Sequence, residues 1–231
     1  GAGGAADDWI GADLLNQILI NWRAVWWQQP EELAEYTPRA MWDKMEDWYT
    51  TYGLAMNEKS FYLILEAEKT HPSSVSQPSS MNDDGPHAAL TQMARDVLDR
   101  SIHLYETEGL TQCLPSTAFF NLVLKIWNVS RRPDAAPAQC ETILDRMHRH
   151  GVIPNARTYR LLIHTWASLE TPEGARRAQD WLDAMHAQYA DDGIDALKPD
   201  AAAIAMVMEA WGKSGAPDCG QQAMIVYQKF G

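Results

Sequence analysis

Apolar residues in this chain recur at intervals of three and four positions, and no long stretch alternates apolar and polar residues with a period of two. This spacing is typical of amphipathic helices and not of strands. Four of the apolar stretches end in a tryptophan at the same phase, at Trp22, Trp127, Trp166 and Trp211, and they read LNQILINW, FNLVLKIW, YRLLIHTW and IAMVMEAW. The pattern predicts an all-α protein, in which each of these first helices is followed by a second amphipathic helix.

Turn-forming residues separate the helix pairs at regular points. The second helix of a pair is followed by a glycine and then an apolar residue, at Gly53, Gly109, Gly151 and Gly193. Glycine favours the left-handed conformation that closes many helices. Short polar side chains able to cap the next helix come a few residues later, at Asn57, Ser116, Asn155 and Asp200. The order is therefore first helix, turn, second helix, glycine, cap.

A unit of two helices that recurs along one chain indicates a solenoid, because one pair cannot bury its apolar face alone and has to stack on its neighbours. We expect one α-solenoid domain over residues 1–231. Its helix-turn-helix repeats are predicted at 12–57, 58–116, 117–155, 156–200 and, truncated, 201–231.

The segments GVIPNARTYRLLIHTWA and LKPDAAAIAMVMEAWGKSG resemble the junctions of pentatricopeptide repeats. The resemblance covers nearly the whole chain and is specific from residue 115 onward. It implies a right-handed superhelix of helical hairpins. The predicted units are longer than the family's, which have about 35 residues, and repeat two carries a polar insertion, THPSSVSQPSSMNDDGPH, at 70–87. Its composition predicts a mobile surface loop.

Pentatricopeptide repeats bind single-stranded RNA with one base per repeat. The resemblance implies that an early residue of each first helix and the last residue of the repeat contact the base. The candidate base-reading residues in this chain are Asn16 with Asn57, Asn121 with Asn155, and Arg160 with Asp200. The two Asn–Asn pairs resemble the family's combination for pyrimidines.

A structural interpretation of the same residues stays open. Asn57, Asn155 and Asp200 are also the residues that helix N-termini prefer as caps. The tryptophans are expected in the core, although an exposed aromatic ring can stack on a base. Candidate phosphate contacts are Arg157 and Lys213, the second of which stands where the family places a lysine.

The charge of the chain, −12 in total, is unfavourable for RNA over much of its length. Residues 1–116 carry 18 acidic and 7 basic side chains, whereas residues 117–180 carry 6 acidic and 9 basic ones. An acidic surface repels phosphate. An excess of basic over acidic side chains is therefore confined to the predicted repeats three and four.

Motifs for catalysis, cofactors and membrane insertion are absent from the sequence. There is no phosphate-binding glycine loop, HExxH or GxSxG, so we expect neither an enzyme nor a cofactor or small-molecule substrate. The three cysteines lack CxxC spacing, which argues against a metal site and indicates buried thiols in a reducing compartment. No run of 18 apolar residues predicts a membrane span.

The sequence therefore predicts a non-enzymatic binding module. The resemblance favours single-stranded RNA in a mitochondrion or plastid, with a transit peptide removed before Gly1. The alternative is a protein–protein interaction scaffold, or a structural subunit of a large organellar assembly. The acidic charge of the chain, the irregular lengths of its units and its insertions are all compatible with that role.

Overall fold

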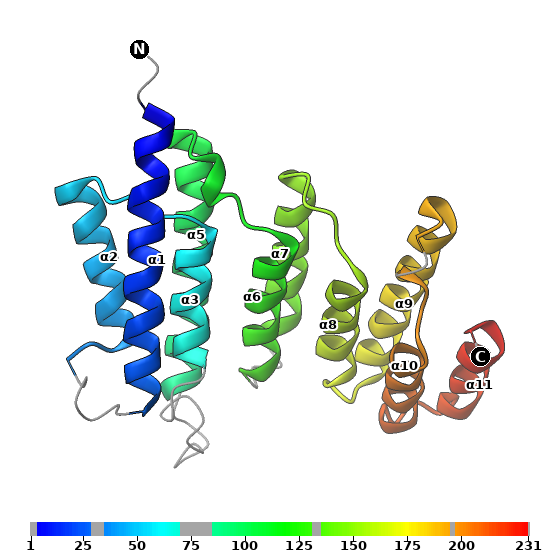
Figure 1. Cartoon of the computed structure of the whole chain (residues 1–231). Helices are drawn as coiled ribbons and strands as arrows, with labels where there is room; N and C mark the ends of the chain where they lie inside the picture. The colour runs from blue at the N-terminus through cyan, green and yellow to red at the C-terminus, as the bar shows by residue number, and fades with distance from the viewer. Residues whose placement is uncertain (1–3, 29–34, 70–84, 131–134, 195–196, 231) are drawn as a thin grey trace. The chain divides into compact units, whose positions relative to one another are not determined.

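The computed structural model describes residues 4–28, 35–69, 85–130, 135–194 and 197–230 (Figure 1). Within these ranges the chain is helical and contains no strand, which confirms the all-α prediction. The α-helices are α1 (Gly4–Gln28), α2 (Pro38–Tyr52), α3 (Glu58–Lys69), α5 (Gly85–Glu108), α6 (Thr117–Val129), α7 (Ala136–Arg149), α8 (Ala156–Ala167), α9 (Pro172–Asp192), α10 (Ala201–Lys213) and α11 (Cys219–Phe230). A short 3-10 helix, η1 (Thr111–Cys113), follows α5.

Four helices begin at the first residue of a predicted repeat: α3, α6, α8 and α10. Their starts are fixed by the polar residues before them. The Asn155 side chain accepts a hydrogen bond from the Thr158 amide at 3.2 Å, and the Thr158 hydroxyl accepts one from the Asn155 amide at 3.1 Å, which completes a capping box. The first helix differs from the expectation, since α1 begins at Gly4 and not near residue 12. The two alanines and two aspartates at 5–8 favour a helical first turn.

The glycines that follow the second helices adopt the predicted left-handed conformation. Their φ angles lie between 65° and 68° at Gly53, Gly109, Gly151 and Gly193. At Gly53 the amide donates to the Tyr49 carbonyl at 3.0 Å, and the next amide donates to the Trp48 carbonyl at 3.3 Å. This arrangement satisfies carbonyl groups at the end of α2 that have no partner within the helix.

The predicted loop at 70–87 is wrong at its C-terminal end. Residues 85–87 form the first turn of α5, because Pro86 is readily accommodated at the start of a helix and the apolar pattern that follows continues the helix. Residues 70–84 lie outside the described part of the chain.

The chain divides into two compact units, Gly1–Ile126 and Trp127–Gly231. In the first unit, α3 packs against α1, α2 and α5. The largest fully buried side chains here include those of Phe61, Phe119 and Phe120. The prediction of one continuous solenoid over both units stays a prediction.

In the second unit, α8 packs against α7 and α9, and α10 packs against α8, α9 and α11. One apolar cluster joins Ile163 of α8, Ala178 and Leu182 of α9, and Val207 and Trp211 of α10. Two first helices contact both helices of the preceding pair: α3 contacts α1 and α2, and α10 contacts α8 and α9.

The in-phase tryptophans contribute to the core, as expected. Trp22, Trp127 and Trp211 are buried, and Trp166 is half-buried against the cluster of the second unit. The guanidinium of Arg177 lies 5.0 Å from the centre of the Trp166 ring, in a cation–π contact. The Trp22 indole donates to the Tyr36 carbonyl at 2.9 Å, and the Trp211 indole donates to Gln179 at 2.8 Å.

The cysteines differ in access to solvent, which leads to a prediction. Burial raises the pKa of the Cys113 and Cys140 thiols to about 12 each, whereas Cys219 is partly exposed. Because the thiolate is the reactive form, we expect iodoacetamide at pH 8 to modify Cys219 first. Peptide mass spectrometry checks the order, with the protein in guanidinium chloride as the control in which all three react. Modification of Cys113 or Cys140 as fast as Cys219 in the folded protein would contradict this packing.

Candidate binding surface on the first helices

The first candidate pair, Asn16 and Asn57, is joined inside the first unit. Asn16 is 3% exposed, and its side-chain amide donates to Asn57 Oδ1 at 3.2 Å. Asn57 also caps α3, since its Oδ1 accepts from the Ser60 amide at 3.1 Å. The Ser60 hydroxyl then donates to Asn16 Oδ1 at 2.8 Å, so the nitrogen and the oxygen of the Asn16 side chain each have a hydrogen-bond partner within the unit.

The pair Arg160 and Asp200 forms an equivalent link between α8 and the start of α10. Arg160 Nη1 lies 2.5 Å from Asp200 Oδ2, and Asp200 Oδ1 accepts from the Ala203 amide at 2.9 Å. Partial burial raises the pKa of Asp200, but the hydrogen bonds from Ala203 and Arg160 outweigh it and lower the pKa below its ordinary value. The aspartate is thus held ionised, as both a helix cap and a partner of Arg160.

Asn121 lies in the first unit and Asn155 in the second. Asn121 is 3% exposed within α6. Asn155 is exposed but serves as the cap of α8. Burial of Asn121 removes its amide from the surface on which a base would be read.

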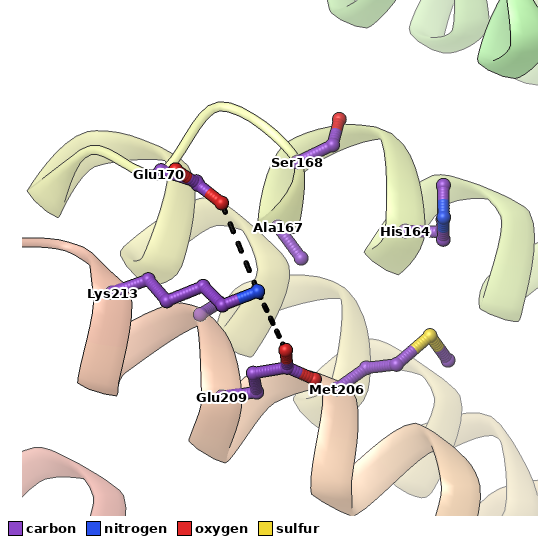
Figure 2. Close-up of a pocket in the computed structure, with 8 residues that line it drawn as sticks. His164, Ala167, Ser168, Glu170, Met206, Glu209 and Lys213 are labelled. Carbon is purple, nitrogen blue, oxygen red and sulfur yellow. Dashed lines mark ion pairs between the residues drawn. The ribbon is translucent and has the colours of Figure 1, made fainter.

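The two candidate phosphate contacts have different surroundings. Arg157 is exposed in the first turn of α8. Lys213 extends between two carboxylates, with Nζ 2.6 Å from Glu209 and 3.8 Å from Glu170 (Figure 2). The hydrogen bond to Glu209 raises the pKa of Lys213, which stays charged, yet the two carboxylates offset its charge. The negative charge of the two carboxylates would weaken the attraction of Lys213 for a phosphate.

A groove of about 230 Å³ lies between α8 and α10 around Lys213 (Figure 2). His164, Ala167 and Ser168 line it from α8 and the α8–α9 turn, and Met206, Glu209 and Lys213 line it from α10. A second groove, of about 420 Å³, lies in the first unit beside Trp27 and the Arg23–Glu66 ion pair. Each groove is lined by apolar side chains and by charged side chains that form ion pairs with one another.

Sequence analysis missed several links between consecutive repeats. The Ser116 hydroxyl donates to the Glu58 carboxylate. This bond links the residue before α6 to the first residue of α3. On the second helices, Arg177 of α9 donates to Glu141 of α7 at 2.8 Å, and Gln179 of α9 accepts from Trp211. Glu141 and Gln179 each directly follow a fully buried residue, Cys140 or Ala178. That burial is seen only in the structure, so the sequence contains no signal that would have identified Glu141 and Gln179.

No family model, curated protein or solved structure matches this chain. Across the described residues, no helix is both long and apolar enough to cross a membrane. The same residues contain no group of three or more His, Cys, Asp or Glu side chains placed to hold a metal ion.

Proposed function

We propose that this chain is a non-enzymatic helical-repeat module of the pentatricopeptide type, and that it serves as a protein-interaction scaffold. The observation that carries the proposal is the internal use of the residues that would read RNA. Asn16 is buried and bonded to Asn57 and Ser60, and Arg160 is paired with the cap residue Asp200. These side chains connect repeats to one another.

Using the same residues to read bases would carry an energetic cost. A buried amide that loses its partners costs about 1–3 kcal/mol unless the ligand replaces every bond. For Asn16 a base would have to replace bonds to two residues and also reach a side chain that is only 3% exposed. An exposed base-reading pair would have no such cost.

Charge supports the same choice of partner. The balance of −11 over residues 1–116 opposes the phosphate backbone, and Lys213 in the second unit is offset by Glu170 and Glu209. Protein interfaces have no requirement for a basic surface. The repeated packing of a first helix on both helices of its predecessor supports the solenoid arrangement that this function uses.

The test is binding of fluorescently labelled oligocytidine, oligouridine and oligoadenosine, each 12 nucleotides by design, at about 20 mM salt, where phosphate contacts are strongest. We expect no saturable change in anisotropy for any of the three.

RNA reading would instead give saturable binding that weakens steeply with added salt. In that case Asn121→Ala and Asn155→Ala should weaken binding to the pyrimidine strands more than to oligoadenosine, because base contacts carry sequence. Arg157→Ala, as the matched comparison, should weaken all three strands alike. That combined result would overturn the scaffold proposal.

A further inference from the structure

The links from a first helix to the cap of the next first helix define one register in both units. Asn16 of α1 bonds to Asn57, the cap of α3. Arg160 of α8 bonds in the same way to Asp200, the cap of α10. The linking residue stands six positions before the in-phase tryptophan of its helix in each case. Positions on α1 and α3 can therefore be matched to positions on α8 and α10 by counting from these links.

A glutamate recurs in this register, and in the first unit it pairs with an arginine of the preceding first helix. Nine positions after the cap, α3 carries Glu66 and α10 carries Glu209. Glu66 is bound by Arg23 of α1, whose Nη1 lies 2.5 Å from the carboxylate. Seven positions after the linking residue, where α1 has Arg23, α8 has Ala167. The second unit thus retains the glutamate of this ion pair, while an alanine stands at the position of the arginine.

The groove between α8 and α10 opens at this point and carries excess negative charge. Ala167 and Met206 lie on its walls, and its volume is about 230 Å³. Figure 2 shows the carboxylates of Glu170 and Glu209 on two sides of the Lys213 ammonium. Nζ is 2.6 Å from Glu209 but 3.8 Å from Glu170, which is beyond hydrogen-bond distance. Two carboxylates around one ammonium leave this end of the groove suited to a second cation.

Lys213 does not close the groove to such a cation. Its side chain is 53% exposed, and Glu209 is the residue four positions earlier on the same helix. An exposed pair of this kind contributes little to stability, so the lysine can turn into solvent at small cost. A guanidinium can donate two parallel hydrogen bonds to one carboxylate, which an ammonium cannot match in geometry. An incoming arginine is therefore the better partner for Glu209.

We infer that the α8–α10 groove binds an arginine side chain of a partner protein. The guanidinium lies between Glu170 and Glu209, and its aliphatic stem lies along Met206 and Ala210. The inference rests on the proposed scaffold function and specifies the partner's chemistry as an exposed arginine. The chain's net charge of −12 favours the approach of a basic segment.

The probe is N-acetylarginine amide, titrated into the full chain labelled with ¹³C at the methionine methyl groups. Met206 lines the groove, and its signal is assigned by its loss in Met206→Leu. We expect a saturable shift of this signal with a Kd on the order of 1 mM, as a ligand of this size allows. N-acetylcitrulline amide, in which an uncharged urea replaces the guanidinium, should cause no saturable shift.

Two substitutions at the carboxylates test the role of their charge. Glu209→Gln and Glu170→Gln should each weaken arginine binding at least about threefold, because each removes a charge with little change in shape. The matched control is Glu173→Gln. Glu173 pairs with Arg176 on α9 and is not among the residues that line the groove. The loss of the same charge there should leave affinity within about twofold.

Two further variants change the cations of the groove. Ala167→Arg places a guanidinium at the position of Arg23, so it should bind Glu209 within the chain and abolish the shift caused by the probe. Lys213→Met removes the competing ammonium and should strengthen arginine binding. Circular dichroism establishes that every variant keeps the wild-type helical content.

Three results would overturn the inference: no saturable shift with the wild-type chain, an equal shift with the citrulline probe, or an equal loss with Glu173→Gln. A shift caused by sodium phosphate and abolished by Lys213→Met would also overturn it, because the groove would then bind anions. Failure of these tests without RNA binding leaves the scaffold proposal standing. RNA binding together with specific arginine binding would remove the scaffold proposal and leave the arginine site.

Discussion

Replacing Trp211 by alanine should lower the free energy of unfolding by about 3–5 kcal/mol, the usual range for deletion of a buried aromatic side chain. Trp211 is 7% exposed, and its ring belongs to the apolar cluster that joins α8, α9 and α10. Its indole N–H also donates to Gln179 of α9. The substitution would remove both the packing and the hydrogen bond, and urea denaturation followed by circular dichroism measures the loss.

Trp27→Ala is the control for this experiment. Trp27 is 64% exposed on α1, so its removal should change stability by no more than about 0.5 kcal/mol. Equal effects of the two substitutions would contradict the assignment of the in-phase tryptophans to the core.

Gly174→Ala should destabilise the second unit by about 1–3 kcal/mol through overpacking. Gly174 is buried in the first turn of α9, where its amide is bonded to the cap residue Thr171 at 3.0 Å. A Cβ at this position would lie 2.6 Å from the carbonyl oxygen of Trp166. Backbone cannot move aside as a flexible side chain can, so the α8–α9 turn would have to open. Thermal unfolding of the purified variant measures the cost.

Gly212→Ala makes the same chemical change in α10, at a position where an added Cβ meets nothing within 4 Å. Alanine is the better helix former, so this variant should be as stable as wild type or more stable by up to about 1 kcal/mol. If Gly212→Ala lost as much stability as Gly174→Ala, the close approach of the Trp166 carbonyl would not be the reason that residue 174 has to be glycine.

The helix boundaries could be predicted from the sequence because they depend on local chemistry. Asn155, Asp200 and the left-handed glycines act through hydrogen bonds within a few residues, and these are the boundaries that the structure reproduces. The start of α1 was missed because Gly4 has no capping signal and the apolar pattern begins later. The first turn of α5 is not predicted from the sequence, because Pro86 and His87 follow a polar stretch and show no apolar periodicity of their own.

The candidate site was harder to predict because it depends on contacts between residues 40 or more positions apart. The sequence does not show the tertiary partners of a polar residue early in a helix, so its side chain is easily assigned to ligand binding. Asn16 instead meets Asn57 and Ser60, and Arg160 meets Asp200. A family resemblance identifies the positions in a repeat, but it does not reveal which partner the side chain has.

The double role of Asp200 has a consequence for how the second unit unfolds. One carboxylate both starts α10 and holds Arg160 of α8, so fraying of α10 would release a bond in the preceding repeat as well. In the proposed solenoid, this bond would add to the coupling between neighbouring repeats, relative to the intrinsic stability of each repeat. Strong coupling suppresses states in which α10 and α11 open while α8 stays intact. The carboxylate therefore favours the unfolding of α10 together with the contact to α8 that it stabilises.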